Sequence, residues 1–255
     1  MKRARLILLF AAVSGFSAEA RDKVSVPVAG SIVAPGANTA TVTNPAGLVD
    51  SSGARLSLQG GSEDPMANPT YRALILAGNG MFGASAGVNY KINDGSADDK
   101  GYAIYGLAVN VAPLGLTLGA AGKSGIHSAE GTDFNAGLLL RPIPFVTFGA
   151  TAFGLKNSVD SLGAGVGLEV LDGVDLVADS AFDRNLKNAQ FKPGLRLANA
   201  FAGLSMSYGT GATDQFAKDF SAAAYLKIAA NSELEFEYNH GGDLPKYFGS
   251  LSFGF

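Results

Sequence analysis

The C-terminal end of the chain alternates between large or apolar residues and small polar ones with a period of two. From Tyr247 to Phe255, every second residue from Tyr247 onward belongs to one set, and Ser250, Ser252 and Gly254 belong to the other, with Phe248 as the exception. Successive side chains of a β-strand point to opposite faces, so this pattern predicts a strand with one apolar and one polar face. The same pattern recurs backwards through most of the chain, which predicts an all-β fold.

We predict fourteen strands between residues 54 and 255, with twelve as the alternative count. The clearest strand, residues 233–239, places Leu234, Phe236 and Tyr238 on one face and polar side chains on the other. Strands of about ten residues are long enough to cross a membrane when tilted. Since an open sheet would expose unpaired backbone groups to lipid, a transmembrane antiparallel barrel is the expected fold. A soluble β-sandwich is the alternative.

The connections between the predicted strands alternate between short and long. Tight turns such as Asn79-Gly80 and Asp172-Gly173 alternate with longer polar links such as Ser62–Pro69 and Gly241–Lys246. This asymmetry is typical of outer-membrane barrels, in which short turns face the periplasm and longer loops face outward. It predicts an even strand count and both chain ends in the periplasm. The stretch Phe145–Lys156 is less regular, and we expect a β-bulge there.

The N-terminus has the features of a secretory signal peptide over residues 1–20. Basic residues come first, Leu6 to Val13 form a short apolar run, and Ala18-Glu19-Ala20 fits a cleavage site. The apolar run is shorter than the roughly 20 residues of a spanning helix. Cleavage would remove three basic residues and Glu19, which changes the formal net charge from −3 to −5. This mildly acidic chain gives no reason to expect a nucleic-acid partner. It also contains no cysteine.

Many charged residues of the predicted barrel fall on the face that points into the lumen. Their side chains either pair with one another and fill the lumen or create a transverse field across a water-filled pore. The predicted lumen charges are Arg55, Arg72, Lys91, Lys123, Arg141, Glu169, Asp175, Asp179, Asp183, Lys192, Arg196, Lys227, Glu233, Glu235 and Glu237.

Residues 21–53 do not alternate and differ in composition from the predicted barrel at 54–255. The segment is rich in small and apolar residues and contains Pro27, Pro35 and Pro45. It is too apolar for a typical disordered linker. A fourteen-stranded barrel also has a lumen larger than its own side chains fill. We therefore expect an N-terminal hatch that plugs the barrel.

The run from Ala37 to Leu48, which ends in Asn44-Pro45-Ala46-Gly47-Leu48, resembles the hatch motif of the long-chain fatty acid transporter family. That family includes outer-membrane transporters of aromatic hydrocarbons. The resemblance implies a fourteen-stranded barrel in which Asn44, Pro45, Ala46 and Gly47 form the hatch motif. The outer loops of this chain are shorter than those usual in the family.

The C-terminal strand also resembles the ending of bacterial outer-membrane barrels, which assembly machinery reads. By this resemblance Leu251, Phe253 and Phe255 form the assembly signal, and the protein lies in the outer membrane of a Gram-negative bacterium. Its expected partners are outer-membrane lipid, the barrel-assembly machinery and a small hydrophobic ligand. A periplasmic or secreted protein partner is a further option.

The sequence offers little for catalysis or metal binding. The two histidines are His127 and His240, and Asn239 would point to the face opposite His240, so the pair cannot act together. Asp94, Asp98 and Asp99 lack the spacing of an EF-hand. We expect a non-enzyme without metal or cofactor. Three functions remain: passive uptake of small hydrophobic molecules, diffusion of polar solutes through a porin, and a plugged structural or partner-binding barrel.

Overall fold

The computed structural model describes residues 31–51, 53–64, 67–92, 100–126, 131–156, 158–186, 189–211, 219–229, 232–241 and 245–255. The predicted signal peptide, His127 and the aspartates at positions 94, 98 and 99 lie outside these residues. The strands are β1 Gly53–Asp64, β2 Ala67–Gly78, β3 Phe82–Lys91, β4 Lys100–Val111, β5 Leu116–Gly125, β6 Asp133–Ile143, β7 Val146–Phe153, β8 Ser161–Leu171, β9 Val174–Asp183, β10 Ala189–Ala198, β11 Ala202–Gly209, β12 Asp219–Ala229, β13 Ser232–Gly241 and β14 Pro245–Gly254.

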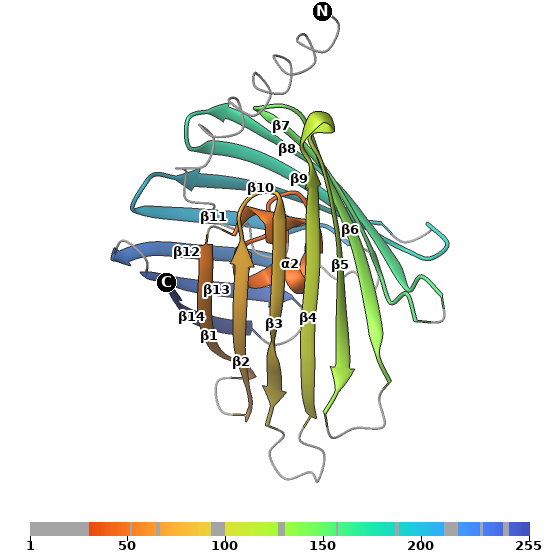
Figure 1. Ribbon diagram of the computed structural model, residues 1–255, viewed down its shortest axis with the longest axis vertical. Coiled ribbons are helices and arrows are strands. Elements are labelled where there is room, and N and C mark those ends of the chain that lie inside the picture. The colour runs from red at the N-terminus through yellow and green to blue at the C-terminus, as the bar shows by residue number, and fades with distance from the viewer. Residues whose placement is uncertain are drawn as a thin grey trace, which may run out of the picture.

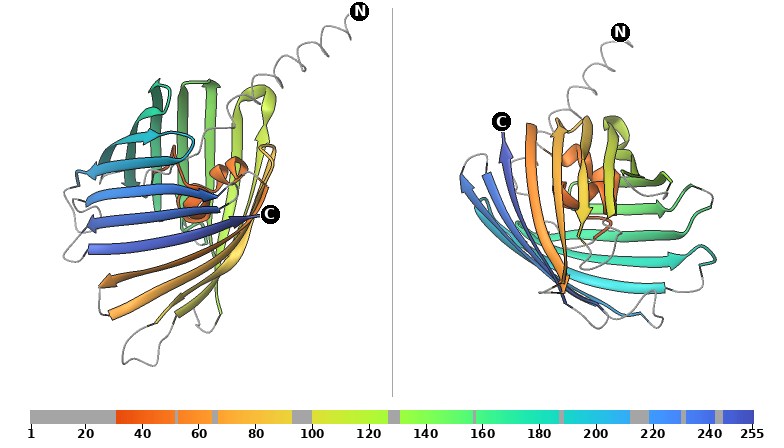
Figure 2. Two further views of the ribbon diagram at one scale, coloured as in Figure 1. Left: turned by 90° about the vertical axis from the view of Figure 1, so that its left-hand side faces the viewer. Right: turned by 90° about the horizontal axis from the view of Figure 1, so that it is seen from below.

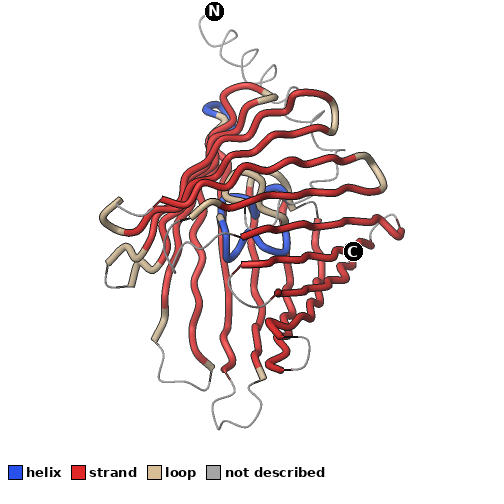
Figure 3. The backbone as a smooth tube through the Cα atoms, turned by 180° about the vertical axis from the view of Figure 1, so that it is seen from behind, coloured by secondary structure: helices blue, strands red, loops and turns tan. Residues whose placement is uncertain are grey.

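The fourteen strands form one closed antiparallel barrel (Figure 1). Each strand pairs with its neighbours in sequence, and β1 pairs with β14 from Arg55↔Gly254 to Ser62↔Tyr247. The prediction of an all-β barrel with fourteen rather than twelve strands is confirmed. The strands are strongly tilted, so β1–β6 and β9–β13 cross at a steep angle on opposite sides of the barrel (Figure 3).

The strand pleat separates an exposed outer face from a covered inner face. On β13 the outward Phe236 is 56% exposed, whereas Glu235, its neighbour in sequence, is 8% exposed. Apolar side chains cover the outer face of most strands, as on β4, where Leu107 is 69% exposed. This is the arrangement of a barrel whose surroundings are apolar.

Two connections differ from the prediction. The expected link Ser62–Pro69 is mostly strand, because Ser62 pairs with Pro69 and Asp64 with Ala67. The polar side chains of this stretch do not prevent pairing, since the ladder uses backbone groups. The β-bulge expected within Phe145–Lys156 lies instead before this stretch, on β6, where the β6–β7 register shifts between Leu140 and Ile143.

Residues 31–51, here called the inner segment, lie inside the barrel (Figures 1 and 2). The segment contains the helix α2, Ala37–Thr43, and the 3-10 helix η2, Pro45–Asp50. The hydroxyl of Thr39 accepts a hydrogen bond from the Gly36 N–H at the start of α2. Pro45 ends α2 and opens η2, because proline lacks an N–H but fits the first turn of a helix. No helix within the described ranges is long and apolar enough to cross a membrane.

Candidate functional site

The inner segment rests on glycines of the barrel wall. A Cβ atom added at Gly119 would lie 2.4 Å from the backbone N of Ala46, and one added at Gly83 would lie 2.3 Å from the backbone C of Leu48. Any side chain at these positions would collide with the segment. Seven inward-facing glycines share this property and form what we call the glycine seat: Gly78, Gly83, Gly106, Gly119, Gly137, Gly149 and Gly163.

An apolar cluster fixes the same side of the segment to the wall. Ala40, Leu48 and Val49 of the segment pack with Leu74, Leu76, Ile104 and Ala108, which β2 and β4 direct into the lumen. Fully burying one such side chain contributes roughly 1.5–3 kcal/mol. Leu74 and Leu76 break the rule of polar-in and apolar-out, because the surface that they face is the apolar inner segment rather than water.

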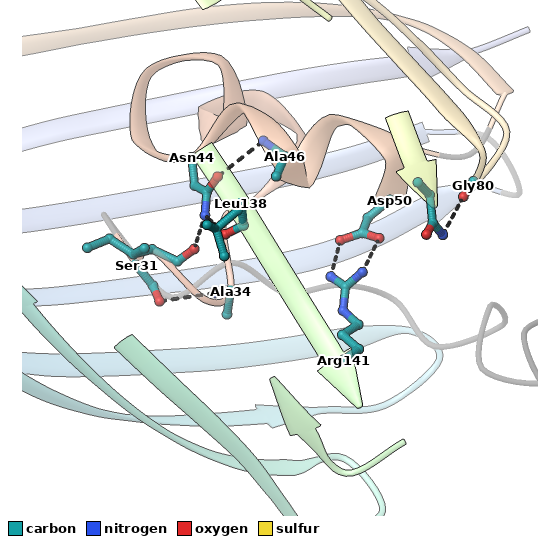
Figure 4. A network of polar contacts seen from close by, with 10 residues as sticks. Ser31, Ala34, Asn44, Ala46, Asp50, Gly80, Leu138 and Arg141 are labelled. Carbon is teal, nitrogen blue, oxygen red and sulfur yellow. Dashed lines mark hydrogen bonds and ion pairs between the residues drawn. The ribbon is translucent and has the colours of Figure 1, made fainter. Parts of the chain in front are cut away.

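Asn44 stands at the centre of the inner segment and is fully buried. Its side-chain amide donates hydrogen bonds to the carbonyls of Ile32, at 2.8 Å, and Leu138, at 3.1 Å. Its Oδ1 accepts a hydrogen bond from the Ala46 N–H at 3.1 Å (Figure 4). This one side chain therefore links the start of η2, the irregular stretch around Ile32 and β6.

The other three residues of the predicted motif, Pro45, Ala46 and Gly47, are buried as well. A Cβ at Gly47 would lie 2.4 Å from Cγ of Pro35, so the segment also packs closely on itself.

Polar contacts hold the opposite side of the inner segment. The Asn38 amide donates to Glu235 Oε2 at 3.1 Å and to the hydroxyls of Ser250 and Ser252. The carboxylate of Asp179 accepts hydrogen bonds from the first described residues of the segment, namely the Ser31 hydroxyl and the next two backbone N–H groups.

Two further contacts tie the segment to β3 and β6. The Thr41 hydroxyl donates to Ser85 Oγ at 2.8 Å. At the end of η2, Asp50 forms an ion pair with Arg141, whose Nη2 lies 2.6 Å from Asp50 Oδ2 (Figure 4). The segment is thus held by packing and polar contacts on β2–β8, by Asp179 of β9, and by polar groups of β13 and β14.

Most predicted lumen charges have an identified partner in the structure. Ion pairs join Arg55 with Glu233, Lys192 with Asp219 at 2.8 Å, and Arg196 with Asp175 at 2.8 Å. The charge of Glu237 is attracted by Arg72 and Lys192, and the Lys123 ammonium lies 5.0 Å from the centre of the Tyr102 ring. Lys227 is the cross-strand partner of Glu233. Lys91, Glu169 and Asp183 also make polar or electrostatic contacts.

The sequence analysis missed two members of these pairs, Asp50 and Asp219. Both lie at element ends, where the period-two pattern gives no face assignment. Cross-strand register would have been needed to find them, since Asp219 reaches Lys192 from β12 while Lys192 belongs to β10.

The predicted assembly residues Leu251, Phe253 and Phe255 belong to the outward-facing set at the end of the chain. The Phe255 N–H donates to the Ala54 carbonyl at 3.0 Å, which extends the β1–β14 pairing to the last residue. His240 stacks on Tyr238, with ring centroids 6.4 Å apart. In the described part of the chain, no group of three or more acidic, histidine or cysteine residues is arranged to hold a metal ion.

An apolar groove of about 720 Å³ lies on the outer side of the wall, over β2–β5. Outward-facing Ala77, Ala84 and Ala120 line it, together with Gly78, Gly83 and Gly119 of the glycine seat. The wall is thin here, because small residues occupy both of its faces. Only this layer of backbone and small side chains separates the groove from η2.

Comparison with solved structures identifies the fold. The monoaromatic hydrocarbon channel CymD matches with a TM-score of 0.58 and 11% identity over 85% of this chain and 92% of CymD. The toluene transporter TodX of Pseudomonas putida matches with a TM-score of 0.58 and 10% identity over 88% and 95% of the two chains. The outer membrane protein Omp33 of Acinetobacter baumannii matches with a TM-score of 0.57 and 11% identity over 80% and 98%.

The chain has the fold of outer-membrane channels. No protein-family model matches the sequence, and no curated protein matches it. The resemblance of Asn44-Pro45-Ala46 to the fatty acid transporter family therefore stays a prediction.

Proposed function

We propose that this protein is an outer-membrane channel for the passive uptake of small hydrophobic molecules, and that the inner segment is the hatch that closes it. In this proposal residues 1–20 direct export, the C-terminal strand directs assembly into the outer membrane, and both chain ends lie in the periplasm. The barrel performs no chemical step and carries no cofactor.

The observation that carries the proposal is the glycine seat. A general diffusion porin needs a water-filled lumen, and its wall has no reason to lack side chains along one path. Here seven wall glycines coincide with the path of the inner segment, and a methyl group at most of them would collide with it. The wall is therefore shaped around the segment, which supports a closed resting state.

Two further observations support a hydrophobic substrate. The groove over β2–β5 is apolar and lies against a part of the wall where glycines separate it from η2. An apolar molecule in the surrounding membrane would find a complementary surface there. In addition, two of the proteins with this fold are a hydrocarbon channel and a toluene transporter.

The charges of β9–β13 favour a second candidate, a channel for polar solutes. Asp175, Asp179, Lys192, Arg196 and Glu237 line the side of the lumen away from the glycine seat. If the segment moved aside, a solute passing along this wall would meet polar groups. The glycine seat supports a closed resting state for either candidate. The two candidates are therefore distinguished by which molecules the channel admits.

A disulfide between the segment and the wall tests the proposal. The chain has no native cysteine, and the hydroxyl oxygens of Thr41 and Ser85 lie 2.8 Å apart, so Thr41→Cys with Ser85→Cys places two sulfurs within bonding reach. The mature variant is reconstituted into liposomes in its reduced and oxidised forms, beside a version that lacks residues 21–51. We measure the entry of toluene and, by swelling, the entry of a small sugar.

The proposal expects toluene entry by the reduced protein, loss of that entry on oxidation, and sugar entry only in the truncated version. Sugar entry through the reduced full-length protein would identify a polar channel instead. Equal toluene entry in the reduced and oxidised states would show that the segment does not control passage.

A further inference from the structure

Two glutamates on the inner face of β13, Glu233 and Glu235, contact the N-terminal part of the chain. Glu233 forms an ion pair with Arg55 of β1, and Glu235 accepts a hydrogen bond from Asn38 of the inner segment. Arg55 lies beyond β14, which separates β13 from β1 in the barrel. Asn38 reaches Glu235 from the lumen and also contacts β14.

The geometry of β14 makes these contacts feasible. Ser252 and Ser250 face Glu233 and Glu235 across the β13–β14 pair, and β14 ends at Gly254. Two strand spacings separate β13 from β1, a span of roughly 10 Å. A glutamate and an arginine that extend toward each other cover this distance. Because serine and glycine side chains are short, they leave that path open.

The β1–β14 pair is the seam of the barrel, the place where its first and last strands meet. Every other pair of neighbouring strands is also consecutive in the sequence, whereas the seam joins the two ends of the barrel chain. Bringing such distant residues together costs more chain entropy than forming a hairpin. The seam is therefore the pair with the least local support, and contacts across it have the greatest effect on closure.

We propose that Glu233 and Glu235 form a clasp that holds this seam closed, with Asn38 as its partner on the inner segment. Hydrogen bonds in which one group is charged are the strongest of their kind, and these lie on the covered inner face. The clasp couples two events: when the segment is seated, Asn38 binds Glu235 and both serines of β14, so seating also secures the last strand. This role is independent of which molecule the channel admits.

The test compares the clasp with an ion pair away from the seam. The clasp variant is Glu233→Gln with Glu235→Gln. The matched control is Asp175→Asn, which breaks the ion pair with Arg196 between the adjacent strands β9 and β10. The side chains of this pair are 14–20% exposed, similar to the 17–18% of Arg55 and Glu233. The readout is the rate at which the folded, heat-modifiable form is lost at a fixed temperature in detergent.

Engineered disulfides then locate the defect. Gly60 and Gly249 are cross-strand partners on the outer face of the seam, and a Cβ at either has only ordinary contacts, at 3.7–3.9 Å. Gly60→Cys with Gly249→Cys therefore ties the seam without crowding. Leu138→Cys with Ala150→Cys ties β6 to β7 instead, where these two residues are partners.

We expect the clasp variant to unfold about tenfold faster than the parent, which corresponds to about 1.4 kcal/mol. The oxidised seam disulfide should restore the parental rate, and the β6–β7 disulfide should not. The seam disulfide should leave the Asp175→Asn defect in place. An unchanged rate in the clasp variant, or equal rescue by both disulfides, would overturn the proposal. If the double variant does not assemble, Asn38→Ala enters the same comparison with the same expected pattern.

Discussion

Adding one methyl group to the glycine seat should open the channel without weakening the barrel. The change is Gly119→Ala. The new Cβ would lie 2.4 Å from the backbone N of Ala46 and from the backbone C of Pro45, whereas ordinary contacts begin at 3.4 Å. The obstacle is backbone rather than a flexible side chain, so the inner segment must move by about 1 Å or leave its seat.

The expected size of the effect follows from the cost of overpacking. Forcing an extra methyl into a packed site costs about 1–3 kcal/mol. A penalty of about 2 kcal/mol on the closed state raises the ratio of open to closed channels about 30-fold. The barrel itself should not suffer, because alanine is favoured over glycine in a strand interior by roughly 0.5–1 kcal/mol.

Single-channel recording in planar bilayers measures this ratio directly. Gly167→Ala is the matched control, because Gly167 also faces the lumen but its Cβ would meet Val33 Cγ2 at an ordinary 3.5 Å. The same substitution is also made in the truncated protein that lacks residues 21–51. There Gly119→Ala should leave the open fraction unchanged, because the segment that it would displace is absent. An open fraction equal to that of Gly167→Ala, or an equal effect in the truncated protein, would refute the reasoning.

Three further substitutions have expected outcomes of different size. Asn44→Ala removes three hydrogen bonds of a fully buried side chain, so it should destabilise the closed state by about 1–3 kcal/mol and raise the open fraction, measured as above. Arg141→Met breaks the ion pair with Asp50, whose two side chains are 35% and 32% exposed. Because solvent weakens such a pair, the closed state should lose less than about 1 kcal/mol, and the open fraction should rise only slightly. Phe236→Arg places a charge on the outer face at a cost of about 2–4 kcal/mol, so the heat-modifiable band should disappear when the variant is assembled into liposomes. Normal assembly of this variant would mean that the outer and inner faces are assigned wrongly.

The period-two pattern was sufficient to predict the strands and their number. It worked because each strand separates an apolar exterior from a covered interior, and successive residues of a strand face these two sides in turn. The pattern failed where the contrast disappears. Leu139, Ile104 and Val177 face inward although they are apolar, since the surface that they cover is the inner segment or lies close to it.

The sequence predicts a plug over residues 21–53, but it does not predict the contacts that hold residues 31–51. Its composition and its Asn44-Pro45-Ala46 motif indicated a plug. The contacts of Asn38 with Glu235 and of Thr41 with Ser85 join residues far apart in the sequence. They depend on which strands are neighbours and on the rotation of α2 within the lumen, and neither follows from a local pattern. The abundance of glycine was visible, but its alignment along one path required the register of β2–β8.

The glycine seat also determines how easily the wall can bend. Gly78 faces Gly83, and Gly119 faces Gly137, across neighbouring strands. Side chains that touch across a sheet stiffen it, and these pairs have none. With the inner segment in place, Pro45 to Val49 brace this bare stretch from within. If the segment left, as the proposed function requires, this stretch would have little side-chain contact across its strands, so the circumference could distort there while the side-chain-rich wall of β9–β14 keeps its curvature.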